Sequence, residues 1–367
     1  MKRTPLYEGH VALDAKLVDF AGWQMPIHYS GVVDEYHAVR KAAGLFDVSH
    51  MGRIAVEGPG ALAFLQRTTT NDVAKLAVWQ SHYSMVCNPQ GGIKDDIFIY
   101  RTKPREFLLC VNASNREKIL TWLREHLVHR QGCALHDRSF DLAQLALQGP
   151  ASRVIMDKLG VLGLSSLKPR HCLEGMVFDI PCFISRTGYT GELGYELYVQ
   201  ADNARRLWEG LLTQGRDVGL KPAGLGARDL LRLEMAYLLY GNDIMEETTP
   251  LEAGAEWVVD FRKSDFIGRS RLMQQQDLGP PRRLMAFELL HKAIPRHGFK
   301  IFSGGQPAEK EIGEVTSGNL SPILQKGIGL GYVAPQFAEV GSRFMVDIRG
   351  KMVQAAVVKP PFYKRRA

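Results

Sequence analysis

The chain has 367 residues and a formal net charge of +7 at pH 7; 45% of its residues are hydrophobic and 23% are charged. This composition is typical of a globular protein with two or three domains. No apolar run approaches the roughly 18 residues that a membrane helix needs, so a membrane-spanning protein is excluded. Lysine and arginine are spread along the chain without an RNA-module signature or a dense basic helix, so nucleic acid is not an expected partner.

The cysteines and the N-terminal sequence indicate the compartment. The 5 cysteines are scattered without a CxxC pair, which predicts buried, reduced thiols and argues against disulfides or a zinc site. The 11 histidines show no metal-ligand spacing, so no metal is expected. The basic residues near the N-terminus are not followed by an apolar segment, which argues against a secretory signal. We therefore expect a cytoplasmic protein.

Two segments of the chain resemble each other. Residues 54–61 and residues 145–152 are each an apolar strand that ends in Gly-Pro, and a helical segment follows each one, over 61–65 and 152–159. Proline suits the first turn of a helix, because its missing N–H group would be unpaired there in any case. The repeat predicts two α+β subdomains, each a sheet backed by helices.

Between the two copies, a turn and a strand over 91–100 are followed by a strand over 106–112 that fits as its hairpin partner, and by a helix over 114–127. Asp95 and Asp96 are adjacent, so on a strand they point to opposite faces and cannot form a catalytic dyad. One of them can face a cavity while the other is solvated or caps the turn. Asn112, at the end of its strand, is either a hydrogen-bonded turn residue or a ligand contact.

A glycine-rich run over 185–199 carries three glycines at a spacing of three and then changes to strand-like alternation. Such a run can fold tightly around a flat ligand, and a decorated β-turn is the alternative. The alternation places Tyr195, Leu197 and Val199 on one face, with Glu196 and Tyr198 on the other. Glu196 would then be held at the rim of whatever the turn encloses.

The rest of the chain predicts a helix over 223–235, a linker over 277–283 and a small all-β domain with turns at 303–306 and 317–319. Arg228, near the start of that helix, could meet an anion or pair with a neighbouring acid such as Asp229 or Glu234. No nucleophile motif is convincing, and GxSxG, a P-loop and a GxGxxG run after a strand are all absent. The remaining carboxylates, tyrosines and amide suit binding of a flat, nitrogen-rich heterocycle whose own nitrogen attacks.

Together these motifs resemble the aminomethyltransferase (T-protein) family of the glycine cleavage system. The resemblance covers nearly the whole chain, in the expected order, through residues 5–7, 20–26, 44–52, 91–96, 186–192, 224–229, 238–241, 265–268 and 316–322. It implies an α+β fold, a cloverleaf of three domains in which two ferredoxin-like sheet-plus-helix subdomains precede a C-terminal β-barrel. We expect the folate-binding region over 1–276 and the barrel domain over 281–367.

The resemblance also implies an activity and a site. Tetrahydrofolate would take the methylene carbon of an aminomethyl group carried on the dihydrolipoyl arm of the lipoyl carrier protein (H-protein), with release of ammonia. Asp96 and Arg228 would be catalytic, and both would also contact folate. The further folate-binding residues would be Tyr83, Asn112, Tyr189 and Glu196.

The sequence departs from the family pattern at two places. It also leaves two alternative functions open. Gln24 stands where an acid is commoner in the family, and residues 168–172 lack the aromatic side chains expected in that loop. A folate-dependent demethylase of the same fold is the first rival. The second is a non-catalytic folate-binding relative, but those proteins use a cysteine in their glycine-rich signature, where this chain has Tyr189.

Overall fold

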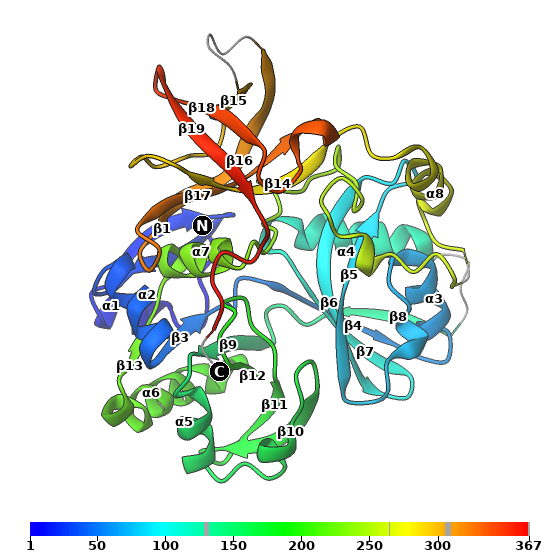
Figure 1. Ribbon diagram of the computed structural model, residues 1–367. Coiled ribbons are helices and arrows are strands. Elements are labelled where there is room, and N and C mark those ends of the chain that lie inside the picture. The colour runs from blue at the N-terminus through cyan, green and yellow to red at the C-terminus, as the bar shows by residue number, and fades with distance from the viewer. Residues whose placement is uncertain (128–131, 264, 305–309, 366–367) are drawn as a thin grey trace. The chain divides into compact units, whose positions relative to one another are not determined.

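A computed structural model describes residues 1–127, 132–263, 265–304 and 310–365 (Figure 1). The chain divides into two compact units. The first unit comprises Met1–Ser84 and Asp95–Asp229, and the second comprises Met85–Lys94 and Leu230–Ala367.

The first unit contains two larger sheets and a small antiparallel pair of strands (Figure 1). The pair consists of β1 (Lys16–Phe20) and β2 (Trp23–His28). The five-stranded sheet has the order β5-β6-β7-β4-β8, with β4 (Gly52–Glu57), β5 (Gln80–Cys87), β6 (Ile93–Lys103), β7 (Glu106–Val111) and β8 (Ala134–Asp137). The six-stranded sheet has the order β10-β11-β12-β9-β3-β13, with β3 (Ala43–Asp47), β9 (Leu142–Gln148), β10 (Cys172–Val177), β11 (Ile180–Ser185), β12 (Gly194–Gln200) and β13 (Leu220–Pro222).

The helices of the first unit are α1 (Tyr7–Ala12), α2 (Val32–Lys41), α3 (Ala61–Thr68), α4 (Arg116–Leu127), α5 (Ser152–Lys158), α6 (Ala204–Gln214) and α7, which begins here and spans Leu225–Glu234. In α6, Leu207, Trp208 and Leu211 form one apolar stripe, and all three are buried in the core of the six-stranded sheet. Ile155 of α5 joins the same core. The helices therefore cover the sheet through their apolar sides.

The repeat is present as two copies of one backbone arrangement. β4 and β9 are each followed by a glycine with positive φ, +109° at Gly58 and +129° at Gly149, and then by α3 or α5. In each copy a backbone N–H donates back to that glycine, from Ala61 to Gly58 at 3.1 Å and from Ser152 to Gly149 at 3.0 Å. A Cβ at Gly149 would lie 2.5 Å from the carbonyl oxygen of Ala42, so the turn requires glycine.

The second unit is built on a closed six-stranded barrel of order β14-β17-β16-β15-β18-β19, preceded by α8 (Arg269–Leu278). Its strands are β14 (Arg283–Leu289), β15 (Lys300–Ser303), β16 (Glu311–Ser321), β17 (Lys326–Val333), β18 (Arg343–Ile348) and β19 (Lys351–Val358). Phe287 and Phe344 meet edge to face inside it, with ring centroids 5.4 Å apart. The predicted mixed fold with a C-terminal barrel is confirmed.

Three local predictions for this region need correction or fall outside the description. Residues 317–319 do not form a turn but lie within β16, where a Cβ at Gly318 would come 2.7 Å from the carbonyl oxygen of Pro295. Glycine serves close packing there, and the chain turns instead at Ser321–Gln325, closed by a 2.9 Å hydrogen bond. The linker is shorter than predicted, since α8 runs to Leu278 and β14 begins at Arg283. Residues 305 and 306 of the predicted turn lie outside the described residues.

Candidate functional site

Asp96 is held by two other residues that the sequence singled out. It lies on β6, where buried and partly exposed residues alternate, and its side chain is on the partly exposed face. The hydroxyl of Tyr83 on β5 donates to Asp96 Oδ2 at 2.8 Å, and the side-chain amide of Asn112 donates to Asp96 Oδ1 at 2.7 Å. The structure therefore brings Tyr83, Asp96 and Asn112 into one cluster, which we call the aspartate cluster.

Asp95 is not solvated, contrary to one of the sequence-based alternatives. Its side chain is fully buried and accepts three N–H groups, from the Asn112 backbone at 3.0 Å, the Asn112 amide at 2.8 Å and the Asn115 amide at 2.6 Å. It caps the 3₁₀ turn Ala113–Asn115 that follows β7, and not the turn next to it in sequence. Burial first and the charge of Asp96 second raise the pKa of Asp95 to about 7, against the three donors, which lower it.

Glu196 lies in a second cluster, on β12 of the six-stranded sheet. The predicted alternation is confirmed, because Leu197 and Val199 are buried in the sheet's core while Glu196 points to the other face. The Thr187 hydroxyl and the Tyr100 hydroxyl, the latter at 3.3 Å, donate to Glu196 Oε2. The amide of Gln144 donates to Oε1 at 3.2 Å. We call these residues the glutamate cluster.

A series of ring contacts connects the donors of the two clusters. Tyr83 contacts Phe98 with ring centroids 5.9 Å apart, Phe98 contacts Tyr100 at 5.9 Å, and Tyr100 contacts Phe183 edge to face at 5.5 Å. Trp79 extends the series, with its ring centroid 6.3 Å from that of Phe183. Trp79, Phe98, Tyr100 and Phe183 pack in one core cluster of the first unit, which also includes Cys172 of the 168–172 loop.

The tyrosines of this series of rings, Tyr83 and Tyr100, are neutral hydrogen-bond donors. Burial first, and then the charges of Asp96 for Tyr83 and of Glu196 for Tyr100, raise the pKa of each phenol well above its usual range. Tyr189 also contributes to the raised pKa of Tyr83, which places Tyr189 within electrostatic range of the aspartate cluster. A neutral phenol beside a carboxylate donates its proton to a hydrogen bond without losing it.

The glycine-rich run, for which the sequence left ligand enclosure and a decorated β-turn open, encloses a side chain of the protein. A Cβ at Gly188 or Gly194 would lie 2.0 Å or 2.3 Å from the amide of Gln148. That amide donates to the Thr187 carbonyl oxygen at 3.2 Å and accepts from the Thr190 hydroxyl at 2.9 Å. The small size of these glycines therefore serves the packing of the run against β9.

A buried ion pair fixes the far side of the same run. The guanidinium of Arg40 on α2 donates to the Thr190 carbonyl oxygen at 2.7 Å and to Glu192 Oε1 at 2.8 Å. The side chains of Arg40 and Glu192 are only 2% and 1% exposed. Removing one partner of such a pair would leave a buried charge, so the contact is strongly coupled to the loop's conformation.

Arg228 and Tyr189 form a third group. The guanidinium of Arg228 lies over the Tyr189 ring, 4.7 Å from its centroid, in a cation–π contact. At the start of α7, a Cβ on Gly224 would lie 2.5 Å from the backbone of Ile27, so glycine allows the helix to approach β2.

Burial first and the charge of Arg228 second lower the pKa of His50 to about 3, which keeps that imidazole neutral.

The sequence analysis did not identify the residues that donate hydrogen bonds to Asp95 and Glu196. Asn115 could have been found from its place at the turn after an apolar strand, where asparagine often caps. Gln144 is an amide in the middle of the apolar run 142–147, which is a signal of an inward-facing hydrogen bond. Thr187 lies inside the glycine-rich run, and nothing in its local sequence marks it as the partner of Glu196.

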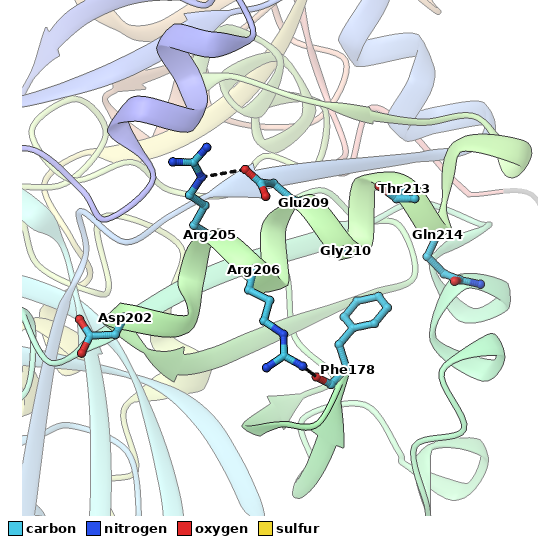
Figure 2. Close-up of a pocket in the computed structure, with 8 residues that line it drawn as sticks. All are labelled: Phe178, Asp202, Arg205, Arg206, Glu209, Gly210, Thr213 and Gln214. Carbon is cyan, nitrogen blue, oxygen red and sulfur yellow. Dashed lines mark hydrogen bonds and ion pairs between the residues drawn. The ribbon is translucent and has the colours of Figure 1, made fainter.

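A shallow cavity elsewhere on the first unit contains none of these residues. Figure 2 shows it along α6, where Arg205 pairs with Glu209 at 2.8 Å and Arg206 donates to the Phe178 carbonyl oxygen at 2.5 Å. The side chains of Arg205, Arg206 and Glu209 are thus engaged with neighbours on the protein. Within the described ranges no group of three or more His, Cys, Asp or Glu residues could hold a metal ion, and no described helix is long and apolar enough to cross a membrane.

Comparison with known proteins identifies the family. Two family models match, the GCVT N-terminal domain over residues 6–263 and the glycine cleavage T-protein C-terminal barrel domain over residues 282–364. The aminomethyltransferase of Desulforamulus reducens is 46% identical over 365 residues, covering 100% of this chain and 99% of that protein. The aminomethyltransferase of Halothermothrix orenii is 48% identical over 362 residues, covering 99% of this chain and 100% of that protein.

A solved structure agrees with the family models and with the two related sequences. The crystal structure of the glycine cleavage system aminomethyltransferase T from Bartonella henselae superposes with a TM-score of 0.92 at 35% identity, and the match covers 100% of this chain and 99% of that one. Sequence and fold thus agree over the full length of the chain. The chain belongs to the aminomethyltransferase family, the T-proteins of the glycine cleavage system.

Proposed function

We propose that this protein transfers the methylene carbon of an aminomethyl group to tetrahydrofolate, which is a co-substrate. The aminomethyl group is carried as a thioether on the dihydrolipoyl arm of a lipoyl carrier protein. The products are 5,10-methylenetetrahydrofolate, ammonia and the free dihydrolipoyl thiol. The reaction balances because folate gives up two N–H hydrogens, of which one ends on the thiol and the other on the ammonia.

Asp96 is the residue whose setting supports this proposal most directly. Breaking the C–S or C–N bond of an aminomethyl thioether places positive charge at the methylene carbon. A carboxylate fixed by two hydrogen bonds, to Tyr83 at 2.8 Å and Asn112 at 2.7 Å, is already oriented to stabilise such charge without reorganising. Its partly exposed face leaves it open to a substrate.

Glu196 supplies the second carboxylate, with a binding role. An ionised carboxylate that accepts an N–H group and an exocyclic amine forms a charge-assisted pair with a pterin ring. Thr187, Tyr100 and Gln144 hold its two oxygens in place. The aromatic rings between the two clusters, Phe98 above all, would stack against the flat part of the ligand.

Arg228 and Tyr189 complete the proposed site. The guanidinium already lies against an aromatic ring, so it keeps its charge with little freedom of movement. In this position it would stabilise the thiolate that leaves when the C–S bond breaks. Tyr189 would contact the aminobenzoate part of folate.

We further propose that residues 1–276 form the folate-binding region and residues 281–367 the barrel domain. The positive net charge of +7 would favour the encounter with an acidic carrier protein. A cytoplasmic location is proposed from the cysteines, which are scattered along the sequence without a CxxC pair.

A turnover assay tests the function. Purified protein is mixed with tetrahydrofolate and carrier protein loaded with the aminomethyl group, and ammonia and 5,10-methylenetetrahydrofolate are measured together. Equal amounts of both products are expected. Folate binding without ammonia release, in the presence of a competent carrier, would contradict the proposal and favour a demethylase or a non-catalytic folate-binding protein.

A further inference from the structure

Each hydroxyl that donates to Glu196 has a second hydroxyl behind it. The phenol of Tyr198 donates to the Tyr100 oxygen at 3.1 Å, and we call these two residues the tyrosine pair. The side-chain oxygens of Ser185 and Thr187 lie 2.9 Å apart and form the serine–threonine pair. Thr187 places its one hydroxyl hydrogen on Glu196, and an ionised carboxylate only accepts, so Ser185 is the donor within its pair. Both pairs therefore end on the same oxygen, Glu196 Oε2.

The register of the six-stranded sheet explains how the two rear hydroxyls come to lie behind the front ones. Ser185 at the end of β11 lies directly opposite Glu196 on β12, and Tyr198 is two residues further along β12 on the same face. Leu197, between them, points to the other face and into the sheet's core. Ser185 is 0% and Tyr198 2% exposed, so neither side chain has surface left for a ligand.

The rear donors matter because the front hydroxyls have an alternative to Glu196. The oxygens of Tyr100 and Thr187 are 3.5 Å apart, so each hydroxyl could turn toward the other. A hydroxyl has one hydrogen to donate, and a donor from behind takes up an acceptor position on its oxygen. Such a donor also polarises the O–H group in front of it and strengthens the hydrogen bond that this group makes. Both effects favour a hydrogen directed at the carboxylate.

We propose that Tyr198 and Ser185 are positioning residues for ligand binding: each donates to a front hydroxyl and so directs its hydrogen at Glu196 Oε2. Among the described residues, neither of the two donates to Glu196 itself, so they act through Tyr100 and Thr187. Loss of both rear donors lets the front hydroxyls turn to each other and frees the carboxylate to rotate. The effect on folate binding rests on the proposed function, whereas the two hydroxyl pairs do not.

A measurement without ligand tests the tyrosine pair. The full chain is prepared with tyrosine labelled at the ζ ring carbon, and the NMR resonance of Tyr100 is assigned by its loss in Tyr100→Phe. Tyr198→Phe keeps the ring and removes only the hydroxyl, so the Tyr100 resonance should move because its oxygen loses a donor. Tyr195→Phe is the matched control, since Tyr195 is a buried tyrosine of the same strand that lies in the core on the other face. The Tyr100 resonance should stay in place in that variant.

Folate affinity tests both pairs together. In the variant Tyr198→Phe/Ser185→Ala, calorimetric titration with tetrahydrofolate should show binding weakened by roughly 5-fold to 10-fold, and kcat at saturating folate should stay within about 2-fold of the wild type. Tyr195→Phe should bind as the wild type does. In a Glu196→Ala background the same two substitutions should weaken affinity by less than about 2-fold, because the residue that they act through is missing. A merely structural role would weaken binding equally in both backgrounds.

Three results would overturn the inference. They are a Tyr100 resonance that stays in place in Tyr198→Phe, wild-type folate affinity in Tyr198→Phe/Ser185→Ala, and an affinity loss that is as large without Glu196 as with it. A wild type that binds no folate, while the Tyr100 resonance moves as expected, would instead overturn the proposed function. It would remove the role of the pairs in folate binding and leave the tyrosine pair confirmed.

Discussion

The aspartate cluster and the glutamate cluster each hold one carboxylate in a fixed orientation, but they do so with different sets of neighbouring groups. In both, a carboxylate on a central strand is held by one phenol and one side-chain amide, Tyr83 and Asn112 for Asp96, and Tyr100 and Gln144 for Glu196. Only the aspartate cluster contains a second acid, Asp95, on the same amide. The glutamate cluster has a third donor, Thr187, where the other has that acid.

This difference separates two chemical roles. A carboxylate whose oxygens are held by several donors is oriented for binding, as Glu196 is proposed to be. A carboxylate next to a second acid can exchange protons near neutral pH, because the charges of the two acids influence each other. The comparison predicts that damage to the aspartate cluster affects turnover, and damage to the glutamate cluster affects binding.

Asp96→Asn should have the largest effect. It keeps the size of the side chain and removes the charge, so kcat should fall by roughly 100-fold to 10,000-fold while folate affinity stays within a few-fold of the wild type. Steady-state kinetics and folate titration measure the two quantities. Asp217→Asn, at a surface ion pair with Lys158 in the same unit, is the matched control and should leave both unchanged. Near-normal turnover of Asp96→Asn would remove Asp96 from the chemistry.

Glu196→Ala should show the opposite pattern. Loss of a charge-assisted pair with the ligand should weaken folate binding by about 10-fold to 100-fold, and kcat at saturating folate should change much less. Calorimetric titration with folate gives the affinity. An unchanged affinity would exclude Glu196 from the ligand site and end the division of roles between the clusters.

The matched pair Tyr83→Phe and Tyr100→Phe compares single phenol donors. Tyr83 donates at 2.8 Å and Tyr100 at 3.3 Å, so the first hydrogen bond is the stronger. Tyr83→Phe should lower kcat by about 10-fold, and Tyr100→Phe should weaken folate affinity by about 3-fold or less. If both variants changed kcat alone, or affinity alone, the two clusters would not have separate roles.

The pH dependence of stability isolates Asp95 from the other residues of the two clusters. Its pKa in the folded protein is raised to about 7, so the stability linked to its proton is fully present below the unfolded pKa, near 4, and is lost as pH rises through about 7. Relative to Asp95→Asn, the wild type should lose up to roughly 1.4 kcal/mol per pH unit within that window. Urea denaturation at several pH values measures this slope. Parallel curves for the two proteins would show that Asp95 ionises as it does in water.

The sequence located the elements of the site better than their internal contacts. The strand containing Asp96, its hairpin partner ending at Asn112 and the alternation around Glu196 follow from local patterns, and all three are confirmed. The donors Tyr100 and Gln144 lie 96 and 52 residues from Glu196, and a single polar residue in an apolar strand has no periodic signal that points to a partner.

Glycine gave the most ambiguous local signal. At Gly318 the sequence predicted a turn, which is wrong, and at Gly188 and Gly194 it left ligand contact and a decorated β-turn open; at all three positions the structure uses the missing Cβ for packing against other parts of the chain. The two uses have the same local sequence, because both require only the absence of a side chain. They are distinguished by what lies opposite the glycine, which depends on the tertiary fold.

The enclosure of Gln148 by the glycine-rich run has a consequence for the speed of binding. Since the run is closed around a side chain of β9 and tied to Arg40, its conformation is held by contacts within the protein itself. Binding then needs no slow ordering of this segment, so the ligand's affinity is not lowered by the entropy cost of ordering it. Association at this side of the molecule should accordingly follow simple bimolecular kinetics, with a rate that rises linearly with ligand concentration.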